Sequence, residues 1–234
     1  MKHLLLLKTG STFDEVIAHQ GDFDQLFITA LGDSAIQLDV VDARSEELPA
    51  LDNYQGVLIT GSHHMVTDRE DWSEALLPYI RAMATQKLPV LGVCYGHQLL
   101  ADALGGEAGY HPDGREVGTV EIDLTEAGQQ DALLGQLPTQ FKAHVTHSQS
   151  ALNLPDNATV LACNDYEPHQ AFRIGENIWG LQFHPEFTAD VCKVYLKHQQ
   201  EPLEELGRDF EQLTGQVSET PDSTALLKRF VELI

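Results

Sequence analysis

The sequence predicts an α/β fold: a doubly wound, mostly parallel central sheet flanked by helices, with a small antiparallel patch and a C-terminal helical extension. Three observations predict this fold. The chain begins with an apolar strand, a helical segment and a second strand, which is the order of a parallel β-α-β unit. Residues 117–124 alternate in the way of a half-solvated antiparallel strand. After Thr188 the pattern is helical and acidic.

In the first half of the chain, apolar spacing defines each expected element. Residues 3–7 form a short apolar run, which is typical of a central strand. Residues 13–32 carry apolar side chains at helical spacing, so we expect one helix there. Strands are expected over 36–41 and 55–62, and a helix over 68–84 should cover the sheet.

The second half is expected to contain short strands and then helices. Strands are expected over 117–124, 140–146, 159–163, 170–174 and 178–183. A helix or turn is expected over 127–137, and terminal helices are expected over 189–200, 202–215 and 223–233. We expect residues 1–195 to form one domain and 196–234 to form a helical extension packed on or beside it. The alternative is that these helices present a surface to a second copy or to a synthase subunit.

Composition excludes several classes of protein. The formal net charge is −22 over 234 residues, and such a surface repels phosphate backbones and anionic lipid. We therefore expect no nucleic-acid or membrane partner. The three cysteines show no paired spacing, which indicates a reducing compartment and a cytoplasmic location. The sequence contains no Cys/His cluster with the spacing of metal ligands, so we expect no metal site.

Cys94 lies where an apolar strand ends and a helix begins. Gly92 and Gly96 flank it, so the turn is tight and a substrate can approach the sulfur. The N-terminus of the following helix favours the thiolate, which is the reactive form. A lone cysteine is more often a small buried hydrophobe. The glycines and the strand-to-helix junction instead favour a nucleophile.

His184, 90 residues after Cys94, is the candidate base for this thiol. A second apolar strand ends near Phe183, and His184 and Glu186 follow on either side of Pro185. A thiol nucleophile needs a base, and the base needs an acceptor that orients its other ring nitrogen. The rigid His-Pro-Glu turn can supply both groups.

Together, Gly-Val-Cys-Tyr-Gly-His-Gln (92–98) and Gly-Leu-Gln-Phe-His-Pro-Glu (180–186) resemble the class I, triad-type glutamine amidotransferases. The chain looks like a stand-alone member similar to the glutaminase domain of GMP synthetase. The resemblance implies a catalytic triad of Cys94, His184 and Glu186, with no cofactor. It also implies a small-molecule substrate, glutamine or a γ-glutamyl compound, and a possible synthase partner or homodimer. No ATP-binding domain is expected in the chain.

The resemblance also implies an oxyanion hole. Gly61-Ser62 matches a glycine pair of the family, so the expected backbone donors are the N–H groups of Ser62 and Tyr95, with Gly61 giving room. A backbone donor survives replacement of the second glycine by serine if that position does not need a positive φ. Such a donor typically contributes about 3 kcal/mol to transition-state stabilisation.

Three further residues are implied as substrate contacts. Gln98 lies one helical turn beyond Cys94 on the same face, and in the family it contacts the bound glutamine. Ser148 and Gln149 match the segment that holds the substrate's α-carboxylate and amino group. They stand where the family often has glycine and aspartate, which puts the amino contact in doubt and is compatible with a substrate larger than glutamine.

The expected function is hydrolysis of the γ-amide of glutamine through a γ-glutamyl thioester, releasing ammonia and glutamate. The alternatives are a γ-glutamyl peptidase with the same triad and a non-catalytic regulatory module. An isomerase, chaperone or deglycase on a similar fold is less favoured, because such proteins commonly lack His-Pro-Glu at this place.

Overall fold

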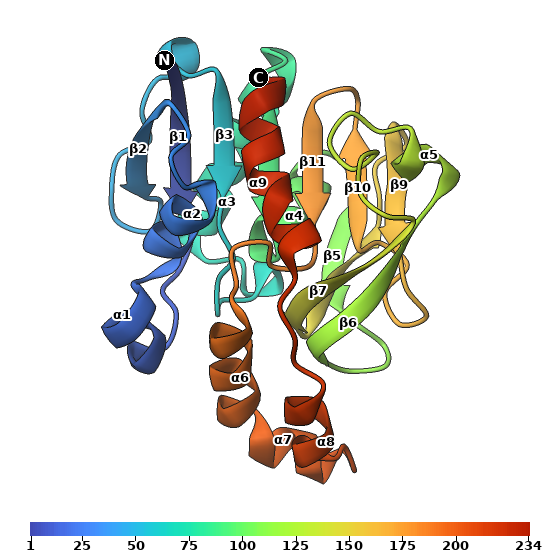
Figure 1. Cartoon of the computed structure of the whole chain (residues 1–234). Coiled ribbons are helices and arrows are strands. Elements are labelled where there is room, and N and C mark those ends of the chain that lie inside the picture. Colours follow the sequence, from blue (N-terminus) through green and yellow to red (C-terminus); the bar gives the residue numbers. More distant parts are fainter.

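A nine-stranded sheet runs through the protein in the order β2-β1-β3-β4-β11-β10-β9-β6-β7, with helices packed on both faces (Figure 1). The computed structural model describes all 234 residues. A separate two-stranded antiparallel sheet is formed by β5 (Glu107–Tyr110) and β8 (Gln149–Asn153). The predicted fold class is confirmed.

One half of the main sheet is parallel. Its strands are β2 (Ile36–Asp42), β1 (Lys2–Lys8), β3 (Gly56–Ile59), β4 (Val90–Val93) and β11 (Ile178–Leu181). The last three are fully buried, as expected for strands covered on both faces. Because they are parallel neighbours, the loops that follow their carboxyl ends meet at one edge of the sheet.

The other half is antiparallel. It consists of β10 (Ala171–Ile174), β9 (Ala158–Cys163), β6 (Glu116–Leu124) and β7 (Gln140–His147). The β6–β7 pairing is continuous and begins with Glu116 opposite His147. The residue before Glu116 is thereby brought next to the residue after His147.

Two apolar clusters fill the spaces on either side of the sheet. On one face, residues of α2 (Phe23–Leu31) and α9 (Pro221–Leu233) pack against the strands, and α9 contributes Leu226, Leu227 and Phe230. On the other face lie α3 (Asp71–Thr85) and α4 (Tyr95–Ala103). The remaining helices are α1 (Asp14–Gln20), α5 (Glu126–Gln129), α6 (Ala189–His198), α7 (Gln200–Glu205) and α8 (Phe210–Gly215).

Two predicted helices are wrong, because each is divided in two. Residues 13–32 form α1 and α2, separated at Gly21, where φ is +87°, and at Asp22, whose carboxylate accepts from the N–H of Phe23. Residues 202–215 are interrupted at Gly207, where φ is +72°. The two strands of the small sheet were absent from the prediction.

The C-terminal segment packs in two ways. Helix α9 completes the core of the main sheet, whereas α6, α7 and α8 surround a small cluster that contains Cys192, Leu196 and Leu203 (Figure 1). The division of the chain at residue 195 stays a prediction. No helix has the length and apolar character needed to cross a bilayer.

Candidate active site

Cys94 occupies the turn between β4 and α4, with φ 52° and ψ −100°. This left-handed backbone is unfavourable for a residue with a side chain and must be held by the surroundings. The flanking glycines permit it: a Cβ on Gly92 would lie 2.6 Å from the backbone of Gly96, and one on Gly96 would lie 2.7 Å from the carbonyl oxygen of Ile59. The Cys94 N–H donates to the carbonyl of Leu181 at 2.8 Å, which ties the turn to β11.

His184 and Glu186 follow the end of β11. The Nδ1 of His184 is 2.8 Å from Oε1 of Glu186, and because a carboxylate only accepts, Nδ1 carries the proton of this bond. The imidazole stacks on Phe187 at 4.0 Å between ring centroids. Its Nε2 is buried and has no hydrogen-bond partner within the chain. That nitrogen is therefore available to a thiol or a substrate.

Gly61, after β3, lies beside both reactive side chains. A Cβ added to Gly61 would be 2.9 Å from Cε1 of His184 and 3.5 Å from the Cβ of Cys94. Cys94 and His184 also line the same cavity, whose volume is about 200 Å³. The structure thus brings together the ends of β3, β4 and β11, as the parallel topology requires.

The charge state of His184 depends on its two neighbours. Burial alone would lower the pKa of His184, but the carboxylate of Glu186 and the Cys94 thiol raise this pKa to about 10. His184 is therefore able to hold a proton at neutral pH while it faces Cys94.

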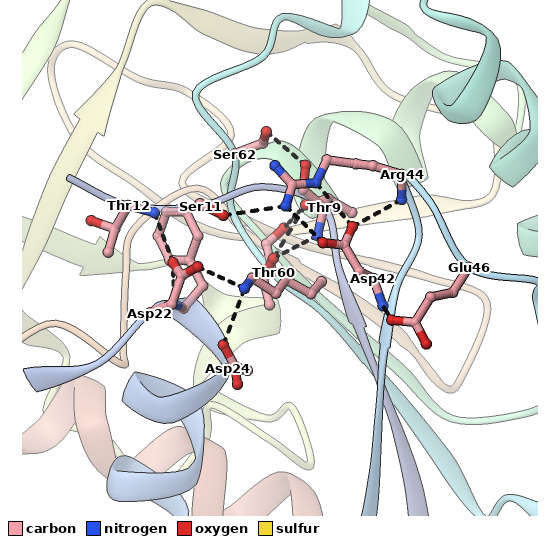
Figure 2. Close-up of polar contacts among 12 residues, drawn as sticks. Thr9, Ser11, Thr12, Asp22, Asp24, Asp42, Arg44, Glu46, Thr60 and Ser62 are labelled. Carbon is pink, nitrogen blue, oxygen red and sulfur yellow. Dashed lines mark hydrogen bonds and ion pairs between the residues drawn. The ribbon is translucent and has the colours of Figure 1, made fainter. Parts of the chain in front are cut away.

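Ser62 is fixed by the loop that follows β1 (Figure 2). Its hydroxyl donates to the carbonyl of Thr9 at 2.8 Å and accepts from the N–H of His64 at 3.1 Å. The φ of Ser62 is not positive, so the backbone at this position tolerates a side chain. The Ser62 N–H has no partner within the chain. Tyr95, the first residue of α4, likewise offers an amide that the helix leaves unpaired.

The loop after β1 is itself held by charged groups. Asp22 accepts from the N–H of Thr12 at 2.8 Å and pairs with Lys8 at 2.6 Å. Arg44 donates to Ser11 from the other side (Figure 2). These contacts give the Ser62 backbone a rigid support.

The three predicted substrate contacts, Gln98, Ser148 and Gln149, all line the cavity. The Nε2 of Gln98 donates to the carbonyl of Gln149 at 2.7 Å and to Oε1 of Gln182 at 3.1 Å, so its amide nitrogen is engaged within the chain. The Nε2 of Gln149 donates to Thr67, whereas its buried Oε1 has no partner. Ser148 Oγ accepts from Nε of Arg115 at 2.8 Å.

The structure adds residues that the sequence analysis missed. Arg115 reaches the cavity from the start of β6, because it is next to the segment that follows β7. An aromatic wall is formed by residues from the loop after β1, from the start of α2 and from α6, namely Phe13, Phe23, Tyr195 and His198. Only the β6–β7 register could have revealed Arg115, and the sequence pattern does not define that register. No group of three or more His, Cys, Asp or Glu side chains is arranged to hold a metal ion.

Comparisons with known proteins concern the family and the fold of the chain. The family model described as "Glutamine amidotransferase class-I" matches residues 15–199. "Gamma-glutamyl peptidase 4" of Arabidopsis thaliana is 32% identical over 198 residues, which is 81% of this chain and 77% of that protein. A GMP synthase (glutamine-hydrolyzing) of Aeropyrum pernix is 33% identical over 174 residues, 73% of this chain but 32% of that protein.

Among solved structures, a glutamine amidotransferase from Thermotoga maritima superposes with a TM-score of 0.78 and 20% identity. The superposition covers 99% of this chain and 97% of that chain. At this identity the likeness concerns the fold.

Proposed function

Because the chain belongs to the class I glutamine amidotransferase family, we propose that it cleaves the γ-amide of glutamine with Cys94 as nucleophile, His184 as base and acid, and Glu186 as the group that orients His184. The observation that carries the proposal is the buried Nε2 of His184, which has no hydrogen-bond partner in the chain and belongs to a residue that lines the same cavity as Cys94.

In the proposed reaction, His184 takes the proton of Cys94 and the thiolate attacks the γ-carbonyl carbon. The resulting oxyanion is stabilised by the N–H groups of Ser62 and Tyr95. The carbon–nitrogen bond breaks as His184 returns its proton to the departing nitrogen, which leaves as ammonia. A γ-glutamyl thioester remains on Cys94.

Water completes the cycle. His184 removes a proton from the water as its oxygen attacks the thioester carbon, and the carbon–sulfur bond then breaks. Glutamate leaves and the thiolate is restored. Glu186 stays ionised throughout and keeps the Nδ1 proton of His184 in place.

A γ-glutamyl peptidase is the second candidate, and specific observations favour it. Relatives of this name match most of their own length, whereas the GMP synthases are matched over a third or less. Ser148 and Gln149 also depart from the family pattern. In this reaction the departing nitrogen belongs to an amine or amino acid, and every earlier step is the same. A synthase partner, a homodimer and a cytoplasmic location stay predictions.

The test is a substrate panel with the Cys94→Ala variant. Glutamine and γ-glutamyl dipeptides are supplied separately, and glutamate, ammonia and free amine are measured. We expect Cys94→Ala to lower turnover by a factor on the order of 10⁴ or more. Cys163→Ala, which removes a partly exposed thiol outside the cavity, is the matched control and should retain the parental rate.

Glutamate release by Cys94→Ala at the parental rate would contradict the assignment. If the parent turns over no member of the panel, an affinity label for glutamine-binding thiols tests whether the protein is a non-catalytic regulatory module. Labelling of Cys94 would show a site that binds glutamine without cleaving it, as a regulatory module does.

A further inference from the structure

The cavity differs in charge from the rest of the protein. The chain has 36 Asp and Glu residues against 14 Lys and Arg, yet none of the 17 residues that line the cavity is acidic. Arg115 is the only Lys or Arg among them, and the other ionisable lining residues are mainly histidines. In a protein of net charge −22, such a lining attracts an anion rather than a cation.

Arg115 has no carboxylate partner. Its Nε donates to Ser148 Oγ at 2.8 Å, and its side chain takes part in no ion pair. Arg44, Arg69 and Arg173, by contrast, each contact an aspartate at 2.7 Å or less. Burial lowers the pKa of Arg115, but a guanidinium remains protonated in proteins. A half-buried cation without a counter-ion therefore lies at the cavity wall.

The carboxylate of Glu116, the next residue, is not available to neutralise the guanidinium of Arg115. Arg115, which precedes β6, contacts Ser148, whereas Glu116, the first residue of β6, contacts His147 on the neighbouring strand. Glu116 is also fully engaged, because it accepts from Nε2 of His147 at 3.0 Å, from Asn164 at 2.7 Å and from Gln170 at 2.8 Å. The same contacts fix the start of β6 and hence the backbone position of Arg115.

We propose that Arg115 is the anchor for a carboxylate of the γ-glutamyl substrate and thereby selects substrates that carry that group beside the scissile amide. Its Nη atoms form no hydrogen bond within the chain, while Nε is fixed on Ser148. A planar guanidinium held in this way can donate two parallel hydrogen bonds to a carboxylate. The anchor is a binding residue, separate from the bond-breaking steps.

Two carboxylates have this chemistry. One is the α-carboxylate of the γ-glutamyl unit, which glutamine also carries, and the other is the carboxylate of a departing amino acid. The unpartnered Oε1 of Gln149, two positions from His147 in the same wall, is placed to accept from an ammonium group. The pair of Arg115 and Gln149 thus offers complementary contacts to an amino acid zwitterion.

The inference rests on the proposed function, and the experiment separates the two. Arg115→Gln is compared with the parent on glutamine, glutamine α-amide, γ-glutamylglycine and γ-glutamylglycine amide. Arg81→Gln, an exposed arginine on α3 outside the cavity, makes the same change of charge and is the matched control. Thermal unfolding checks that each variant is folded.

We expect Arg115→Gln to raise KM for glutamine by about 10- to 100-fold with little change in kcat. If the α-carboxylate is the ligand, the effect disappears on glutamine α-amide. If the departing carboxylate is the ligand, KM for γ-glutamylglycine rises and KM for its amide does not. Arg115→Lys keeps the positive charge but loses the planar guanidinium that donates two parallel hydrogen bonds. Its KM for glutamine should therefore lie between the values of the parent and of Arg115→Gln.

Equal KM values for Arg115→Gln and the parent on all four substrates would overturn the anchor while leaving the nucleophile assignment intact. Failure of the parent on every substrate would instead concern the proposed function. In that case calorimetric binding of L-glutamine to Cys94→Ala, with and without Arg115→Gln, still tests the anchor. Unchanged affinity in the double variant would overturn it.

Discussion

The two halves of the main sheet contribute differently to the cavity. The parallel half is apolar inside and supplies its reactive groups only from the ends of strands, where Cys94 and His184 emerge. The antiparallel half carries polar side chains within its interior, and the buried Glu116, His147 and Gln170 form one hydrogen-bonded network. We infer that the parallel half supplies the chemistry and the antiparallel half supplies recognition.

The largest effect expected from this division is at Glu186, on the parallel side. Glu186→Gln should lower kcat by about 1000-fold, because an amide at this place stabilises the wrong tautomer of His184. Steady-state kinetics measure the loss. A similar KM in variant and parent would agree with a purely chemical role, whereas an unchanged kcat would contradict it.

The same variant gives a pH test. The pKa of His184 is raised from its ordinary 6.5 to about 10, so the associated stabilisation is complete below pH 6.5 and is lost as the pH rises toward 10. The difference in free energy of unfolding between parent and Glu186→Gln should therefore shrink from pH 6.5 to pH 10. Urea unfolding at both ends of this range measures it. A difference that grows with pH would show that His184 is not charged in the folded protein.

The next effect is steric and is expected at Gly61. A Cβ there would be 2.9 Å from His184 Cε1, so Gly61→Ala should displace the imidazole and lower kcat/KM by about 100-fold. Gly215→Ala is the matched control, because a Cβ at Gly215 meets open space and φ is not positive there. Equal activity of the two variants would show that the space beside His184 is not needed.

On the antiparallel side the expected effect is on binding and stability. Glu116→Gln removes the charge that His147, Asn164 and Gln170 share, so it should raise KM by about 10-fold and lower the free energy of unfolding by roughly 2 kcal/mol. Kinetics and urea unfolding measure the two quantities. Glu121→Gln, exposed on the same strand, should change neither. A fall in kcat without a rise in KM for Glu116→Gln would contradict the assignment of substrate recognition to the antiparallel half of the sheet.

The smallest effect is expected at Ser62. Ser62→Ala keeps the backbone N–H but loses the hydroxyl contacts with Thr9 and His64, so kcat should fall by no more than about threefold. Ser34→Ala, which also removes a hydroxyl bonded to a backbone carbonyl, serves as the control outside the cavity. A loss as large as that of Glu186→Gln would assign a direct role to the Ser62 hydroxyl.

The parallel half is the part that sequence reasoning predicts well. Its strands are short apolar runs, and their carboxyl ends must meet, so Cys94 and His184 could be placed at one edge without coordinates. The breaks at Gly21 and Gly207 were missed because apolar spacing continues across them, while a positive φ depends on the backbone.

The part of the cavity wall formed by Arg115, Ser148 and Gln149 could not be predicted in the same way. Arg115 enters the cavity only through the pairing of Glu116 with His147, and partners 31 residues apart leave no local signal of register. The small sheet of β5 and β8 was missed for a related reason, since its strands pair across 38 intervening residues or more. Ser62 was predicted as an amide donor, and its support by Thr9 emerged only from the fold.

The order of Arg115 and Glu116 at the start of β6 has an evolutionary consequence. Farther along β6, Ile122 and Leu124 are anchored in the apolar core. Insertion of one residue between these anchors and Glu116 would put the Glu116 carboxylate in the place of the guanidinium, and loss of one residue would put Gly114 there. Point substitutions on the solvent-exposed side of β6 are therefore expected to be tolerated, whereas a single-residue insertion or deletion would remove the guanidinium from the cavity and be selected against.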